Sequence, residues 1–219
     1  MIKAAIFDLD GTILDTLSTI AHYANIALGQ MELEPIDVEK FKYFAGDGRS
    51  VLVHRFLSYR NADTASNHSK AVQIYDSEYE KDVIYDSKPF DGIYEVLSTL
   101  KKSGVKLAVF SNKPDIVAEM VVDKMLPNLF DICWGKKENI PTKPDPTGVH
   151  MILEYLKTDN NDAIFIGDTD VDINTAKNAQ MKSVGVLWGF RDEAELKNAG
   201  ADFIISKPSE LADIILQSD

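Results

Sequence analysis

Two aspartates stand two residues apart at the end of an apolar run near the start of the chain. Asp8 and Asp10 follow the segment Ala4-Ala5-Ile6-Phe7, which is typical of a buried β-strand, and Gly11 comes next. Burying a carboxylate costs several kcal/mol unless a partner or a metal ion offsets its charge. The pair therefore indicates either a solvated polar turn or a site at which a cation binds between the two groups.

Two further segments carry polar side chains suited to an anionic substrate. Ser111 and Asn112 follow the apolar stretch Val105–Phe110, and Lys143 lies in a proline-rich loop. Each has a simpler interpretation, because Ser111 or Asn112 before Pro114 can cap a helix and a loop lysine is usually solvated.

A fourth segment, Gly167 to Asp172, follows the apolar stretch 163–166. Asp168 and Asp172 are four residues apart, so both can face the same way on a helix. An acidic first turn is also favoured by the helix dipole without any function. The simpler interpretations would have to hold independently at all four segments, and we therefore favour a common site.

The elements that must position these side chains are short apolar runs that alternate with helical patterns. Continuous apolar strands between helices predict a parallel sheet covered on both faces, with ligands at the carboxyl ends of its strands. Besides the first, the expected strands are 105–110, 132–134, 163–166, 183–187 and 203–205.

A mainly helical block interrupts this pattern soon after the first strand. We expect an α/β core from residues 1–14 and 88–219, with residues 15–87 inserted as a helical domain. The polar stretch Asn61 to Ser69 is predicted to be a turn. The helices expected in the block are 16–28, 37–44, 50–59 and about 70–81.

The composition is that of a globular protein with a formal net charge of −12, which argues against nucleic acid as a partner. No segment approaches the ~18 apolar residues of a membrane span, and Asp8 interrupts the start too early for a signal peptide. The lone Cys133 cannot form an intrachain disulfide. These features favour a cytoplasmic protein without a membrane anchor, whose oligomeric state the sequence leaves open.

Other catalytic templates do not match. The chain has no G-x-x-x-x-G-K-[ST] phosphate loop and no G-x-S-x-G nucleophile elbow. The four histidines lack the spacing of a zinc site, and the acidic positions that complete a calcium-binding loop after Asp8 and Asp10 are missing.

In order and approximate spacing, the four segments resemble the motifs of the haloacid-dehalogenase-like hydrolases. Asp8-Leu9-Asp10-Gly11-Thr12 is similar to the first motif, Ser111 to the second, Lys143 to the third, and Gly167-Asp168 with Asp172 to the fourth. The helical block resembles the mobile cap of one subclass. Its segment Gly46-Asp47-Gly48-Arg49 and the later Trp188-Gly189-Phe190-Arg191 are similar to segments of phosphoglycolate phosphatases.

The resemblance implies a Rossmann-like core with an inserted helical cap and a Mg²⁺-dependent phosphatase reaction through an aspartyl-phosphate. It implies that Asp8 is the nucleophile and a metal ligand. Asp10 would exchange a proton with the leaving oxygen and bind the metal through its backbone carbonyl, and Asp168 would be a further ligand. Lys143 would offset charge on the transferring phosphoryl group and keep Asp8 ionised, Ser111 would donate a hydrogen bond to a phosphoryl oxygen, and both would bind the substrate together with Asn112. The substrate would be a small phosphorylated metabolite, and Asp172 would hold the neighbouring groups in place.

Arg49 is the cap residue expected to bind an anionic group of the substrate, because a guanidinium can grip a carboxylate or phosphate with two hydrogen bonds. A surface arginine that begins a helix is an equally simple interpretation. Two related enzyme activities stay open, a β-phosphoglucomutase-like sugar phosphomutase and a pyrophosphatase. The alternative from another class is a catalytically silent, metal-binding or interaction module, against which the intact Asp8, Asp10, Lys143 and Asp168 argue.

Overall fold

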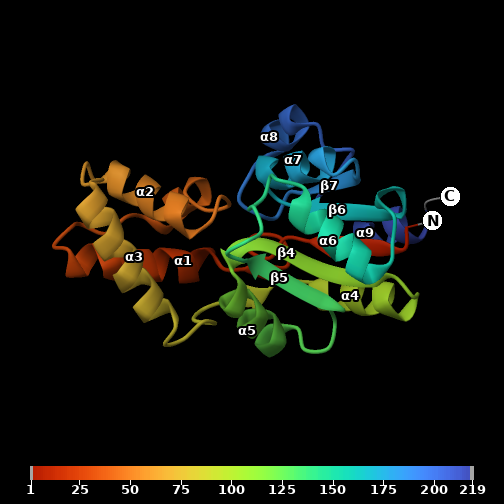
Figure 1. Ribbon diagram of the computed structural model, residues 1–219, viewed down its shortest axis with the longest axis horizontal. Helices are drawn as coiled ribbons and strands as arrows, with labels where there is room; N and C mark the ends of the chain where they lie inside the picture. The colour runs from red at the N-terminus through yellow and green to blue at the C-terminus, as the bar shows by residue number, and fades with distance from the viewer. Residues whose placement is uncertain (1, 218–219) are drawn as a thin grey trace.

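Six parallel strands form the central sheet of the protein in this computed structural model, which describes residues 2–217. The strand order is β5-β4-β1-β6-β7-β8, so the first strand lies inside the sheet with later strands on both sides (Figure 1). The predicted parallel α/β sheet is confirmed. Its strands are β1 (Ala4–Phe7), β4 (Lys106–Pro114), β5 (Ile132–Lys136), β6 (Ala163–Gly167), β7 (Lys182–Val186) and β8 (Phe203–Ile205).

Both faces of the sheet are covered, which explains why its strands are continuously apolar. Along β1, Ala4 and Ile6 pack on one face, and Ala5 and Phe7 pack on the other. The first face is covered by α6 (Thr147–Leu156) and α7 (Asp170–Asn178). The second is covered by α4 (Ile93–Lys102), α5 (Asp115–Met125) and α9 (Glu210–Leu216). The short helices η2 (Asn160–Asp162) and α8 (Glu193–Ala199) complete this part of the chain.

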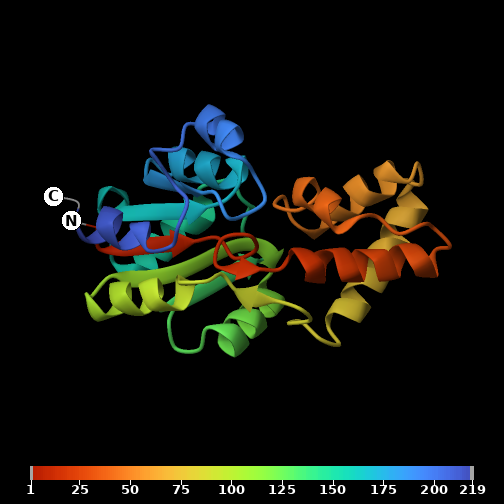
Figure 2. The ribbon, with the colours of Figure 1, turned by 180° about the vertical axis from the view of Figure 1, so that it is seen from behind.

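A separate helical lobe lies beyond the carboxyl ends of the strands, at the opposite end of the molecule from the start of β1 and from α9 (Figures 1 and 2). It contains α1 (Leu17–Gln30), η1 (Val38–Tyr43), α2 (Arg49–Tyr59) and α3 (Ala65–Tyr79). The two chain segments that join it to the sheet pair with each other as β2 (Leu14–Asp15) and β3 (Lys88–Pro89). The chain therefore leaves the sheet layer and returns to it through two neighbouring segments. No helix within residues 2–217 has the length and apolar character needed to cross a bilayer.

The helical lobe differs from the sequence prediction at one element. Helix α3 begins at Ala65, so the second half of the stretch predicted to be a turn is helical. Thr64 caps this helix, because its hydroxyl accepts a hydrogen bond of 3.2 Å from the backbone N–H of Asn67. A threonine cap followed by polar residues suits the exposed first turn of a helix, which carries no apolar periodicity.

Candidate active site

The turn after β1 carries the first two aspartates to the edge of the sheet. The backbone N–H of Asp8 donates to the carbonyl of Ile166 at 2.9 Å, so Asp8 lies where the neighbouring strands β1 and β6 both end. Gly11 follows with a φ of +84°, and a Cβ at this position would lie 2.3 Å from Oδ2 of Asp168. Glycine is therefore required at Gly11 both for the left-handed backbone and for the close approach to Asp168.

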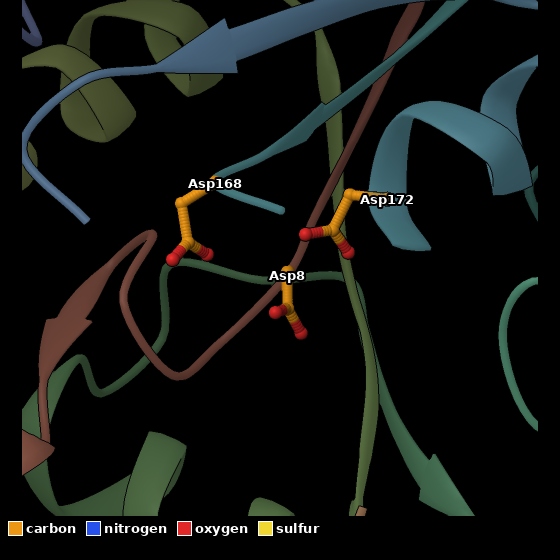
Figure 3. Close-up of side chains that lie close together, drawn as sticks. All are labelled: Asp8, Asp168 and Asp172. Carbon is orange, nitrogen blue, oxygen red and sulfur yellow. The ribbon is translucent and has the colours of Figure 1, made fainter. Parts of the chain in front are cut away.

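Three carboxylates from separate elements meet at this edge, as Figure 3 shows. Asp8, Asp168 and Asp172 are buried, and one oxygen of each lies within 4.8 Å of the others. Lys143 Nζ lies 2.7 Å from an oxygen of Asp8 and 2.7 Å from one of Asp172. Three carboxylates with one ammonium leave an excess of two negative charges when all are ionised, which is the charge that one divalent cation would balance.

The pKa values of the clustered carboxylates also indicate a site for a cation. Burial raises the pKa of Asp8 to about 7, with Lys143 opposing the rise and Asp172 adding to it. Burial, followed by the charges of Asp172 and Asp8, also holds the pKa of Asp168 well above its ordinary value. Hard oxygen donors that carry excess negative charge suit Mg²⁺, so the residues present fit this ion.

Hydrogen bonds fix the orientation of the two later aspartates. Asp168 accepts from the hydroxyl of Thr12 and from the backbone N–H of Phe190, each at 2.8 Å. Asp172 accepts from the backbone N–H of Thr169 at 3.0 Å and from its hydroxyl at 2.8 Å, which caps the start of α7. These contacts aim both carboxylates at the end of β1.

The segment after the apolar part of β4 reaches the same site. The side chain of Asn112 donates to the carbonyl of Lys143 at 3.2 Å and accepts from its backbone N–H at 2.9 Å. It also donates to the carbonyl of Gly46 in the helical lobe at 3.2 Å. Asn112 therefore places the backbone of Lys143 and joins the lobe to the sheet layer. Ser111 is buried and faces the cavity beside Asp8.

A cavity of about 120 Å³ lies between the sheet edge and the helical lobe. The sheet layer contributes Asp8, Asp10, Ser111 and Lys113 to its wall, and the lobe contributes Gly46, Arg49, Leu52, Tyr75, Asp76 and Tyr79. The structure thus brings Arg49 to the cavity wall, where its guanidinium is paired with the carboxylate of Asp76. Asp10 lies on the wall opposite the lobe.

Lys113 is a residue of this cavity that the sequence analysis did not single out. Its Nζ lies 3.1 and 3.2 Å from the two carboxylate oxygens of Asp10. Burial lowers the pKa of the Lys113 ammonium, but Asp10 and Tyr79 outweigh it, so the pKa lies above its ordinary value. The two-residue period of a strand places Lys113 on the same face as Ser111, and this signal was available in the sequence.

Arg191 is the second residue that the sequence analysis left without a role. Its guanidinium donates to the carbonyls of Lys42 and Ala45, the latter at 3.1 Å, and lies 5.7 Å from the ring centroid of Tyr43. Its neighbour Phe190 holds Asp168, so one short loop contacts both the carboxylate cluster and the lobe. The contact partners lie about 150 residues apart in sequence, and no local pattern reveals them.

Known proteins resemble this chain in sequence and in fold. A family model described as haloacid dehalogenase-like hydrolase matches residues 5–186. The chain is 30% identical to a phosphoglycolate phosphatase of Aquifex aeolicus over 97% of its own length and 96% of that protein. It is 32% identical to one of Caulobacter vibrioides, covering 91% and 84%. A solved structure from Lactobacillus delbrueckii subsp. bulgaricus, described as a candidate phosphoglycolate phosphatase, superposes with a TM-score of 0.93 at 32% identity, covering 97% and 98%.

Proposed function

The chain belongs to the haloacid dehalogenase-like hydrolase family, and from this premise we propose that it is a Mg²⁺-dependent phosphatase of a small phosphorylated metabolite of the phosphoglycolate type. The observation that carries the proposal is the buried cluster of Asp8, Asp168 and Asp172 around the single ammonium of Lys143. Such a cluster is costly to bury unless it binds a cation and an anion together, as in a metal-assisted phosphoryl transfer.

Asp8 is the nucleophile in this proposal. Its carboxylate oxygen forms a bond to the phosphorus while the bond from phosphorus to the ester oxygen breaks, which gives an aspartyl-phosphate. Lys143, 2.7 Å from Asp8, keeps that carboxylate ionised and offsets charge on the transferring phosphoryl group. Ser111 donates a hydrogen bond to a phosphoryl oxygen.

Asp10 transfers the protons. It gives a proton to the departing ester oxygen, and then accepts one from the water molecule that attacks the aspartyl-phosphate. This second step releases inorganic phosphate and restores the carboxylate of Asp8. The two aspartates thus have separate tasks, although they are only two residues apart.

The carboxylates of Asp8 and Asp168, with the backbone carbonyl of Asp10, would hold Mg²⁺. When bound, the ion supplies positive charge that offsets repulsion between the phosphate oxygens and the attacking carboxylate. Asp172 orients the site, because one of its oxygens contacts Lys143 and the other is held by Thr169.

We further propose that residues 15–87 act as a cap on a core formed by residues 1–14 and 88–219. The paired strands β2 and β3 lie at both junctions and offer a place for a hinge. A cap that closes over the cavity would exclude bulk water from the aspartyl-phosphate. The small cavity and the acidic net charge favour a small metabolite over a nucleic acid as substrate.

A phosphate-release screen over a panel of metabolites, with and without Mg²⁺, tests the proposed function. We expect Mg²⁺-dependent release from at least one small ester and loss of that release in Asp8→Asn. Adding hexose phosphates and pyrophosphate separates the related activities, since a mutase isomerises a sugar phosphate without net release and a pyrophosphatase cleaves pyrophosphate. A protein that hydrolyses none of these compounds with Mg²⁺ present would be a silent binding module.

A further inference from the structure

The positive charges on the wall of the cavity are already paired with carboxylates of the same wall. Within residues 2–217, the cations that line the cavity are Lys113 and Arg49. Lys113 contacts both carboxylate oxygens of Asp10, and Arg49 pairs with Asp76. A second anionic group on the leaving alcohol would therefore have to compete with a carboxylate for either cation.

The positions of Arg49 and Asp76 in their helices do not favour helix stability. Arg49 is the first residue of α2, where the helix dipole presents positive charge, and Asp76 lies in the last turn of α3, where the dipole presents negative charge. The last turn of α3 holds no basic residue that would offset Asp76. Each charge is therefore offset by the other, and helix stability does not explain why either residue is present.

The pair of Arg49 and Asp76 lies close to the group that we propose for proton transfer. Tyr75, the residue before Asp76, is buried and lines the same cavity. Burial holds the pKa of the Tyr75 hydroxyl well above its ordinary value, and Tyr79, Asp10 and Asp76 raise it further. Arg49 opposes this rise. One hydroxyl is thus within electrostatic reach of both Asp10 and the pair, so an alcohol that takes a proton from Asp10 departs beside Arg49 and Asp76.

A guanidinium held by a carboxylate suits a hydroxyl group better than an anion. The guanidinium of Arg49 has five N–H donors, and the carboxylate of Asp76 has lone pairs beyond those that Arg49 uses. A hydroxyl group can accept from the first and donate to the second without separating them. A carboxylate or a second phosphate on the alcohol can only accept, so it has to displace Asp76 from Arg49 and it meets the negative charge of Asp76.

We propose that Asp76 is a positioning residue that sets substrate specificity through Arg49. It shifts the preference of the cavity toward small esters whose alcohol carries a hydroxyl group, and away from esters that carry a second anionic group. The inference rests on the proposed phosphatase function, but it concerns a residue of the cap that takes no part in the phosphoryl transfer itself. Removing the charge of Asp76 should release Arg49 and reverse this shift.

The test compares esters that differ only in the group at the far end of the alcohol. The first pair is 2-hydroxyethyl phosphate and phosphoglycolate, and the second is 3-hydroxypropyl phosphate and 3-phosphooxypropanoate, which are one carbon longer. The measured quantity is the ratio of kcat/KM for the hydroxyl ester to kcat/KM for the acid. A change in the chemical steps that both esters share cancels from this ratio.

Asp76→Asn should lower the ratio by about 3- to 10-fold in at least one pair of esters. The side chains of Arg49 and Asp76 are 37% and 32% exposed, so the effect should lie between that of an exposed ion pair and that of a hydrogen bond to a buried charge. Asp76→Glu keeps the charge, and its ratio should lie closer to that of the natural protein. In an Arg49→Met background, Asp76→Asn should leave the ratio unchanged, because the effect requires the guanidinium.

The matched control is Glu78→Gln. Glu78 lies in the same turn of α3 as Asp76 and also pairs with a cation, Lys81, at 2.6 Å. It does not line the cavity. The control therefore makes the same change from acid to amide against the same helix dipole, and it should keep the ratio of the natural protein.

Three results would overturn the role of Asp76 while leaving the phosphatase function intact. These are a ratio that Asp76→Asn leaves unchanged or raises in both pairs, an equal fall in Glu78→Gln, and a fall that persists in full in the Arg49→Met background. Hydrolysis of other small phosphate esters but of none of the four test compounds would likewise overturn this role alone. Hydrolysis of no phosphate ester at all would overturn the proposed function and the role of Asp76 together.

Discussion

The ammonium nitrogen of Lys143 lies 2.7 Å from an oxygen of Asp8, and the Lys143 side chain is only 1% exposed. The same nitrogen contacts Asp172, so one buried cation serves two buried carboxylates. This arrangement joins stability to activity at a single residue, because removing the cation leaves charges that water cannot reach.

Lys143→Met should therefore abolish most activity and also destabilise the protein. We expect unfolding to become easier by about 3–5 kcal/mol, as when a buried ion pair loses one partner. Activity should fall by about 10²-fold or more, as when a group that stabilises transferring charge is removed. Urea unfolding and phosphate release measure the two effects.

The control for Lys143→Met is Lys197→Met, which breaks an exposed pair with Glu193. An exposed pair contributes about 0–1 kcal/mol, so this variant should unfold close to the natural protein and keep full activity. A Lys143→Met protein as stable and as active as this control would contradict the assigned role.

Mg²⁺ should stabilise the protein more at neutral than at acidic pH. The pKa of Asp8 is raised to about 7 from its ordinary 3.8, so the folded protein retains a proton there that the unfolded chain has released. The stability of the metal-free protein therefore falls as pH rises from about 4 to about 7. Mg²⁺ competes with that proton, so its benefit grows over the same range.

The measurement is the Tm with saturating Mg²⁺ minus the Tm with a chelator, taken at about pH 5 and about pH 7.5. We expect the larger difference at the higher pH, and almost none at either pH in Asp168→Asn. A Mg²⁺ shift that is equal at both pH values would argue against buried carboxylates as the ligands.

Gly11 and Gly104 form a matched pair for testing the approach of the first turn to Asp168. Their φ angles are +84° and +85°, so alanine is equally strained at both. An added Cβ at Gly104 meets nothing within 4 Å, whereas at Gly11 it collides with the carboxylate of Asp168. Gly104→Ala should cost about 1–2 kcal/mol of stability and leave activity unchanged.

Gly11→Ala should cost more than Gly104→Ala and should also lose the Mg²⁺-dependent rise in Tm, because Asp168 is displaced. Thermal unfolding with and without Mg²⁺ measures both variants. If the two variants lose equal stability and both keep the response to Mg²⁺, the turn does not control the position of Asp168.

Arg191 should position the lobe segment that leads into the Gly46–Arg49 loop. Arg191→Met keeps the aliphatic stem but loses the hydrogen bonds to Lys42 and Ala45. We expect faster amide hydrogen exchange in residues 42–48 and a fall of about 10- to 100-fold in kcat/KM for the best ester, as for a misplaced binding group.

Arg60→Met is the matched control for Arg191→Met. Arg60 also donates to two carbonyls, those of Glu34 and Pro35, but all three residues belong to the lobe. This variant should leave hydrogen exchange in residues 42–48 unchanged. If hydrogen exchange in residues 42–48 is also unchanged in Arg191→Met, the contact between Arg191 and the lobe does not position this segment.

The parts of the protein that the sequence predicted are those in which local pattern and chemistry coincide. Asp8 and Asp168 each follow an apolar strand, Ser111 follows the apolar part of β4, and parallel strands bring their carboxyl ends to one edge. Helix α3 was placed several residues too late, because its capped first turn is polar. The role of Arg49 as a ligand for a substrate anion stays a prediction. The sequence could not reveal its partner Asp76, because the two residues meet only through the packing of α2 against α3.

The residues that joined the site only in the structure depend on contacts between distant segments. Tyr79, in the last turn of α3, meets Lys113 near the end of β4, and Arg191 meets the lobe through carbonyl groups of the backbone. Every residue has a backbone carbonyl, so no pattern of residue types shows which carbonyl accepts a hydrogen bond. Lys113 is different, because the strand period placed it beside Ser111.

The most direct test of the account is a rapid acid quench of the natural protein during turnover of its best phosphate ester, followed by mass spectrometry of the peptide that contains Asp8. We predict a phosphoryl group on Asp8, formed and lost at rates that match phosphate release, and its absence in Asp8→Asn together with a loss of about 10³-fold or more in turnover. Turnover that persists in Asp8→Asn, or a phosphoryl group on any other residue, would contradict Asp8 as the nucleophile.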